Sequence, residues 1–202
     1  MNIFKVASDI GYGSNTYFIV SGPHAAIVDP SINYNSDIKF LGPGCSVDYV
    51  IITHAHFDHI LKVEEWRKNT NAKVVIGKLD APALSNPDVN CYGLFFNSRD
   101  GYFGPYETVS DGEEILLGTE KIKILATPGH TVGSITLLCG DGAIVGDVVF
   151  AHGAIGRTDL PGGDYSTLMQ SIEKIISLSN DSVIYPGHGD VTTVKEIKLW
   201  KR

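Results

Sequence analysis

Cysteine and long apolar runs are both scarce in this sequence. Its three cysteines, Cys45, Cys91 and Cys139, are too few and too scattered for a disulfide framework or a cysteine-based zinc site. No window approaches the roughly 18 to 20 apolar residues that a membrane-spanning helix needs. The acidic residue Asp9 precedes any apolar stretch long enough for a signal peptide. We therefore expect a protein of the reducing cytoplasm with no membrane partner.

Positive charge is also limited. Sixteen Lys and Arg residues face twenty-three Asp and Glu residues, so the formal net charge is -7. Such a surface repels a phosphate backbone, and we expect no nucleic-acid partner. With 43% hydrophobic and 19% charged positions in 202 residues, disorder is excluded. The composition predicts a single globular domain over residues 1–202.

Short β-rich runs separated by Gly, Pro and Asp, with amphipathic stretches between some of them, predict a mixed α/β fold. Strands are expected at residues 15–20, 25–28, 48–53, 73–76, 114–117, 121–126, 134–139, 143–145 and 182–185. Helices are expected after Asp58, around 166–178 and near 193–200. Glycine-containing turns at 22–24 and 140–142 predict two hairpins.

Residues 86–106 combine many aromatic side chains with glycine, proline and little periodicity. The aromatic residues are Tyr92, Phe95, Phe96, Tyr102, Phe103 and Tyr106. We interpret the segment as a long ordered loop that packs on its own domain. The alternatives are a wall of the substrate pocket and a homodimer contact.

The segment Thr-His-Ala-His-Phe-Asp-His at 53–59 carries the chemistry. It follows the apolar run 49–52, and in extended chain His54 and His56 project to the same side. Asp58 and His59 then enter a helical turn and point toward a second position. Burying three imidazoles and a carboxylate without a cation costs several kcal/mol in unpaired polar groups. The pattern therefore predicts a metal site.

Three further apolar strands lead to a histidine or an aspartate, at His130, Asp147 and His188. Ligands in α/β folds gather where strands end and loops begin, so we expect these residues to share a cleft with the first segment. The other two histidines, His24 and His152, are interpreted as ordinary surface or core residues.

The ordered set His54, His56, Asp58, His59, His130, Asp147 and His188 resembles the signature of the metallo-β-lactamase superfamily. The resemblance implies a four-layer αββα sandwich that holds two zinc ions, with iron or manganese as alternatives. One ion would be held by His54, His56 and His130, the other by Asp58, His59 and His188, with Asp147 between them. Asp29 matches a Val-Asp-Pro segment near the metal and would orient a ligand histidine; the alternative is an ordinary Asp-Pro turn.

The segments 146–150 and 156–164 resemble those of short glyoxalase II-like (hydroxyacylglutathione hydrolase-like) hydrolases. This resemblance implies cleavage of an acyl thioester similar to S-lactoylglutathione. A water that bridges two zinc ions would lose a proton and attack the carbonyl, and the catalytic residue Asp58 would steer the hydroxide. Arg157 would bind the substrate carboxylate, or instead form an ion pair with Asp159 or Asp164.

Some departures favour other readings of the same scaffold. The C-terminal extension of full-length glyoxalase II is absent from these 202 residues, and Asp159 stands where an aromatic residue often holds the peptide. Class B β-lactamases place another residue where Asp147 stands, which disfavours antibiotic hydrolysis. Three alternatives are a persulfide dioxygenase with one iron held by His54, His130 and Asp147, a lactonase, and a metal-binding protein without catalysis.

Overall fold

Two six-stranded sheets form the centre of the computed structural model, which describes residues 1–34, 41–42 and 44–200. The first sheet has the order β1-β2-β3-β4-β5-β6. Its strands β1, β2 and β3 are antiparallel, and β3 to β6 are parallel. The strand bounds are β1 (Asn2–Val6), β2 (Thr16–Ser21), β3 (His24–Val28), β4 (Ser46–Ile52), β5 (Lys73–Gly77) and β6 (Glu107–Val109).

The second sheet has the order β12-β11-β10-β9-β8-β7. Strands β8, β9 and β10 alternate in direction, while β10 and β11 are parallel. The strands β8, β10 and β11 therefore all end at the same edge. The bounds are β7 (Glu114–Leu117), β8 (Glu120–Ala126), β9 (Ile135–Cys139), β10 (Gly142–Gly146), β11 (Val183–Pro186) and β12 (Thr192–Thr193).

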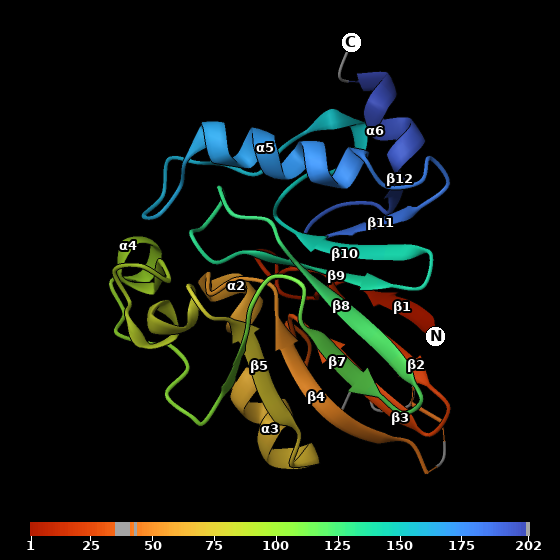
Figure 1. Ribbon diagram of the computed structural model, residues 1–202. Coiled ribbons are helices and arrows are strands. Elements are labelled where there is room, and N and C mark those ends of the chain that lie inside the picture. Colours follow the sequence, from red (N-terminus) through yellow and green to blue (C-terminus); the bar gives the residue numbers. More distant parts are fainter. Residues whose placement is uncertain (35–40, 43, 201–202) are drawn as a thin grey trace.

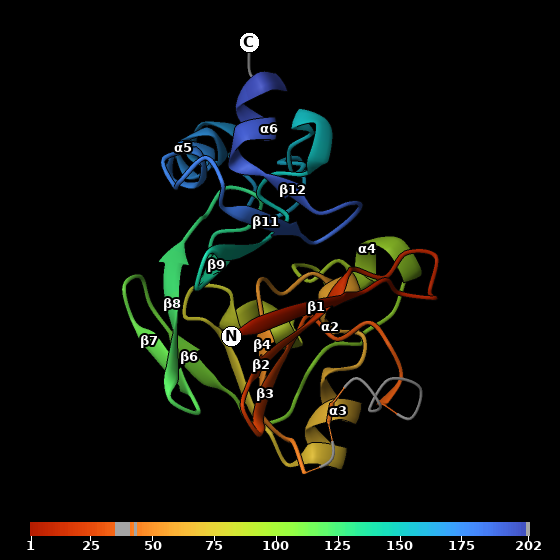
Figure 2. The same cartoon turned by 90° about the vertical axis from the view of Figure 1, so that its right-hand side faces the viewer.

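Helices cover the outer faces of both sheets. Figure 1 shows α5 and α6 beside the second sheet and α3 beside the first, and Figure 2 shows the same layers from the side. This arrangement confirms the expected four-layer αββα sandwich. The helical segments are α2 (Phe57–Ile60), α3 (Val63–Thr70), α4 (Tyr92–Phe96), α5 (Tyr165–Ile176), α6 (Val194–Trp200) and the 3-10 turns η2 (Ala81–Ser85) and η3 (Ala151–Gly153).

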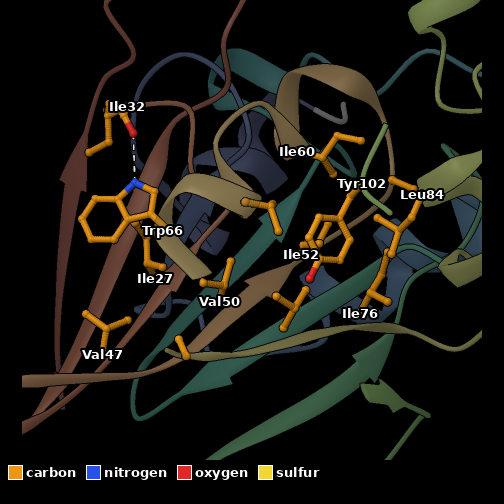
Figure 3. Close-up of a cluster of buried hydrophobic side chains, with 14 of the residues drawn as sticks. Ile27, Ile32, Val47, Val50, Ile52, Ile60, Trp66, Ile76, Leu84 and Tyr102 are labelled. Atoms are coloured by element: carbon orange, nitrogen blue, oxygen red, sulfur yellow. Dashed lines mark hydrogen bonds between the residues drawn. The ribbon is translucent and has the colours of Figure 1, made fainter. Parts of the chain in front are cut away.

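Side-chain alternation along the strands builds the layers. Ile51 of β4 packs between the two sheets, whereas its neighbours Val50 and Ile52 face the helix layer over the first sheet. Trp66 of α3 fills that layer, and its indole Nε1 donates a hydrogen bond of 2.9 Å to the Ile32 carbonyl (Figure 3). The inner strands β2 to β5 of the first sheet are therefore largely buried on both faces, as strands covered by a layer on each side usually are.

All nine expected strands and the expected helices are present, with ends shifted by one or two residues, and both hairpins form. Strands β1, β6 and β12 were missed because β6 and β12 are only three and two residues long and β1 is a half-exposed edge strand. The interpretation of 86–106 as loop alone was wrong, since α4 lies within it. No helix among the described residues is long and apolar enough to cross a membrane.

Candidate metal centre

The ends of four strands meet at one edge of the sandwich. Segment 53–59 follows β4, and His130, Asp147 and His188 follow β8, β10 and β11. Two glycines make this convergence sterically feasible. Gly146 turns with a φ of +54°, and a Cβ added at Gly187 would lie 2.1 Å from Asp147 Oδ1. The backbone before His188 therefore passes the Asp147 carboxylate so closely that only glycine fits at position 187.

The first group of side chains consists of His54, His56 and His130, all of them buried. His56 Nδ1 lies 2.8 Å from His130 Nε2 and 3.1 Å from His54 Nε2. The remaining pair, His130 Nε2 and His54 Nε2, is separated by 3.1 Å. Three ring nitrogens from two strand ends thus converge on one point.

The second group lies beside the first and contains Asp58, His59 and His188. Asp58 Oδ2 is 2.9 Å from His188 Nε2 and 3.5 Å from His59 Nε2. Asp147 lies between the groups: its Oδ1 is 3.5 Å from His59 Nε2, and its Oδ2 is 3.6 Å from both His130 Nε2 and His188 Nε2. All seven side chains named from the sequence therefore share one centre.

Acceptors behind the rings decide which ring nitrogen faces this centre. The buried carboxylate of Asp29 lies with its Oδ2 2.8 Å from His59 Nδ1, and because a carboxylate only accepts, we assign the proton to Nδ1. The same carboxylate accepts from the backbone N–H and hydroxyl of Thr53, at 2.8 and 2.7 Å. Thr53 Oγ1 is in turn 3.2 Å from His54 Nδ1. Asp29 thus contacts one histidine of the centre directly and supports another through Thr53.

His130 is oriented by a group that the sequence did not reveal. Its Nδ1 donates to the main-chain carbonyl of Arg157 at 2.7 Å, which leaves Nε2 facing the centre. Arg157 thereby takes part in the site through its backbone, whatever its side chain does. No side-chain pattern signals such a contact.

Asp80 is a second supporting residue that was missed. Its buried carboxylate accepts from the Ala55 N–H at 2.9 Å, the Thr131 hydroxyl at 2.8 Å and the Gly133 N–H at 2.8 Å. It therefore joins the loop that carries His54 and His56 to the loop that follows His130. An aspartate three residues after the buried strand β5 fits the pattern of the other strand ends, and that signal was available in the sequence.

The electrostatics of the centre favour a cation. Burial, followed by the neighbouring imidazoles, lowers the pKa of His54 and lowers that of His56 to about 3, so both rings are neutral. Burial opposes protonation of His59, yet the surrounding carboxylates, Asp58 first, raise its pKa well above the usual value. Burial also disfavours the ionised form of Asp147, but His59 and its neighbours hold the pKa of that carboxyl below its usual range.

Unpaired polar atoms supply an independent test of the donor set. Among the described residues, the buried side-chain atoms without a hydrogen-bond partner are His56 Nε2, His59 Nε2 and Asp147 Oδ1. The last two face each other across 3.5 Å. A buried acceptor and a ring nitrogen left in this way are costly unless a ligand satisfies them. Imidazole and carboxylate donors without cysteine fit a divalent ion such as zinc, iron or manganese.

A cleft with a volume of about 380 Å³ opens over the centre. Asp58, His130, Asp147 and His188 reach it, together with the buried Cys91 and several apolar side chains. Burial raises the pKa of the Cys91 thiol to about 11, so it stays protonated at neutral pH.

Arg157 also lines this cleft, but its guanidinium forms a two-point ion pair with Asp159, at 2.7 Å from Nε and 2.7 Å from Nη2. The sequence offered Asp159 and Asp164 as ion-pair partners of Arg157, and in the structure Arg157 pairs with Asp159. Asp164 instead caps α5 by accepting from the Thr167 N–H at 2.7 Å.

The remaining histidines lie apart from the centre, as expected. His24 Nδ1 is 2.6 Å from Asp48 Oδ2. His152 stacks edge-on against Trp200 with ring centroids 5.8 Å apart.

Comparisons with known proteins agree with this geometry. The family model described as Metallo-beta-lactamase superfamily matches residues 9–188. The chain is 34% identical to the probable metallo-hydrolase YqgX of Bacillus subtilis (strain 168), an alignment that covers 90% of this chain and 87% of the relative. It is also 34% identical to the hydroxyacylglutathione hydrolase GloC of Haemophilus influenzae (strain ATCC 51907), covering 87% of this chain and 84% of the relative.

Two solved structures are similar throughout. The crystal structure of BLEG-1 B3 metallo-beta-lactamase superposes with a TM-score of 0.88 at 28% identity and covers 96% of this chain and 95% of that one. The crystal structure of TTHA1623 in a di-iron-bound form superposes with a TM-score of 0.82 at 27% identity and covers 97% and 96%.

Proposed function

The chain belongs to the metallo-beta-lactamase superfamily and is a metallo-hydrolase of it, and from this premise we propose that it hydrolyses acyl thioesters with two divalent ions, most simply zinc. His54, His56 and His130 would hold one ion, and Asp58, His59 and His188 the other. The hydrolase GloC, at 34% identity, supports the choice of thioester chemistry.

One observation carries the proposal: the Asp147 carboxylate lies between the two groups of side chains. Its Oδ1 faces His59 Nε2 at 3.5 Å, and its Oδ2 lies equally far from His130 and His188, at 3.6 Å. A carboxylate that reaches both groups suits two neighbouring cations better than one. The negative charges of Asp58, in the centre, and of Asp29, behind His59, would balance part of the charge of two dications.

Divalent ions held by these residues would supply Lewis acidity and lower the pKa of a bound water. The chain's own residues supply the rest. Asp58 reaches the cleft with a partly exposed carboxylate, which would accept a proton from an attacking water. Asp29, Thr53 and the Arg157 carbonyl hold the three histidines that they contact in fixed orientations.

The cleft suits a thiol leaving group. A thiol with a pKa of about 8.5 leaves as a thiolate without a proton donor, whereas an amine needs one. No lysine, serine, threonine or tyrosine is among the described residues that line the cleft. Cys91 stays protonated, with a pKa of about 11, and is a poor nucleophile. A side-chain nucleophile therefore has no support here, and direct attack by water is favoured.

Thiol release from a panel of thioesters tests the proposal. The panel contains S-lactoylglutathione and the acetyl and phenylacetyl thioesters of N-acetylcysteamine, and metal content is measured on the same protein. We expect hydrolysis that falls about 10²-fold or more in His54→Ala and in Asp147→Ala. His24→Ala removes a histidine outside the centre and serves as the matched control, with the rate unchanged. Equal rates in wild type and both centre variants would refute the proposal.

Parallel assays address the other chemistries. An acyl-homoserine lactone and a penicillin test ring opening, the latter because the similar BLEG-1 is a B3 metallo-beta-lactamase. Oxygen uptake on a persulfide tests the dioxygenase. One iron per chain with oxygen consumption, and no thioester hydrolysis, would replace the hydrolase by the dioxygenase.

A further inference from the structure

Apolar side chains from two separate parts of the chain line the cleft. Phe57 of α2 and Phe95 of α4 line one side. Phe150, Ile155 and Leu160, from the segment after Asp147, also line it. Figures 1 and 2 both place α4 next to α2 at the edge where the strands end. A substrate held over the centre therefore meets apolar side chains from both segments.

The wall built by Phe57 and Phe95 is braced. Phe57 contacts four other aromatic rings. The distance from its ring centroid is 5.5 Å to that of Phe95, 5.1 Å to Phe96, 5.7 Å to Tyr92 and 5.9 Å to Tyr12. These separations fall in the range of favourable aromatic pairs. Phe57 stands between His56 and Asp58 in the sequence, so the cluster fixes the wall to the residues of the centre.

Part of this wall remains open to solvent. The side chain of Phe95 is 48% exposed although it lines the cleft. An exposed ring beside a reaction centre gains free energy when an apolar group covers it. The wall therefore offers binding energy to a substrate of matching chemistry.

The cleft offers few cationic side chains for a negatively charged substrate. Among the described residues that line it, Arg157 is the one Lys or Arg side chain. Asp159 occupies two of its guanidinium nitrogens at 2.7 Å, and the chain carries a net charge of -7. Glutathione brings two carboxylates, which need free cationic partners. The cleft does not present a free guanidinium for either of them.

We propose that the preferred substrate is an uncharged thioester with an aromatic-sized apolar group, which packs against Phe57 and Phe95. This inference rests on the proposed thioester hydrolysis and narrows it. The apolar group belongs either to the acyl part or to the thiol part of the substrate, because both flank the same carbonyl.

Two matched substrate pairs separate these sources. The acyl pair is phenylacetyl and acetyl on N-acetylcysteamine, and the thiol pair is acetyl on benzyl mercaptan and on N-acetylcysteamine. We expect at least one pair to show kcat/KM about ten-fold higher for its aromatic member, since hydrophobic pockets discriminate by such factors. A ratio near one in both pairs would overturn the inference.

The two substrates of a pair also differ in intrinsic reactivity. Comparing the same pair on wild type and on variants cancels that difference. Phe95→Ala is expected to reduce the aromatic-to-acetyl ratio of kcat/KM about ten-fold. A circular dichroism spectrum that matches that of the wild type shows that this variant is folded. Phe95→Leu keeps an apolar wall and retains most of the preference. The control is Phe103→Ala, which removes a phenylalanine that is 70% exposed and lies outside the described cleft lining. An equal loss in both alanine variants would overturn the assignment to Phe95.

Freeing the Arg157 guanidinium from Asp159 should shift the preference toward charged substrates, which is a second test. In Asp159→Ala the side chain of Arg157 is free, and we expect kcat/KM for S-lactoylglutathione to rise about five-fold relative to the neutral thioesters. Asp141→Ala makes the same change of net charge in the exposed turn between β9 and β10 and should leave the ratio unchanged.

The outcomes distinguish the two proposals. Failure to hydrolyse any thioester would remove the proposed function. Efficient hydrolysis with S-lactoylglutathione preferred by the wild type would leave that function standing and overturn this inference alone.

Discussion

Asp80→Ala tests how the loops of the centre are held together. The carboxylate accepts two backbone N–H groups, from Ala55 and Gly133, and the hydroxyl of Thr131. The hydroxyl keeps a second partner, Ser134 Oγ, at 2.6 Å, so the truncation leaves the two backbone donors buried and unpaired. At about 1–3 kcal/mol for each unpaired donor, we expect the free energy of unfolding to fall by about 2–6 kcal/mol.

Urea unfolding followed by tryptophan fluorescence measures this loss, because Trp66 is fully buried. Asp80→Asn keeps one accepting oxygen and should lose about half as much. Asp88→Ala removes an exposed carboxylate and should stay within about 0.5 kcal/mol of wild type. Metal affinity, measured by competition with a chelator, should fall about 10- to 100-fold in Asp80→Ala. A loss below about 1 kcal/mol would show that the carboxylate does not hold the two loops.

Three further predictions concern metal, space and pH. Chelation should lower the melting temperature, because the unpaired His59 Nε2 and Asp147 Oδ1 then lose the ion proposed to satisfy them. At a free metal concentration of 100 Kd the effect is about 2.7 kcal/mol per ion, and an unchanged thermal scan would contradict it. Gly187→Ala should abolish tight metal binding in a titration, whereas Gly11→Ala, whose Cβ meets nothing within 4 Å, should bind normally. Burial raises the pKa of Tyr102 to about 12, so the folded state keeps a proton that the unfolded chain loses near pH 10. The free energy of unfolding should therefore fall as the pH rises from about 10 to about 12. In Tyr102→Phe this decline should be smaller.

The sequence predicted the strands of the core well, because buried strands in an α/β sandwich are apolar runs with clear ends. It also predicted which side chains gather at the centre, since each follows such a run: His130 after β8, Asp147 after β10 and His188 after β11. The structure places them within reach of one another, while their role as ligands stays a prediction. The helix α4 was not predicted, because five residues of mostly aromatic character show no periodicity.

The supporting contacts were harder to predict, and the reason is physical. A metal ligand must be one of a few residue types, whereas a supporting acceptor can be any carboxylate or any carbonyl. Asp29 was named because it matches the Val-Asp-Pro segment of the resembling superfamily, and it does contact His59. The Arg157 carbonyl that accepts a hydrogen bond from His130 Nδ1 leaves no trace in the sequence, because every residue has such a carbonyl.

Hydrogen bonds between the two sheets bind the halves of the centre together. The first sheet carries segment 53–59, the second carries the other three residues, and neither set is complete alone. At the shared edge the Ile135 N–H donates to the Thr53 carbonyl at 2.9 Å, and the Tyr17 hydroxyl donates to the Pro186 carbonyl at 2.6 Å. The Asn15 N–H also donates to the Gly187 carbonyl at 2.7 Å. Separation of the sheets would therefore pull the two sets of side chains apart, and metal affinity should track the stability of the sandwich across variants of its core.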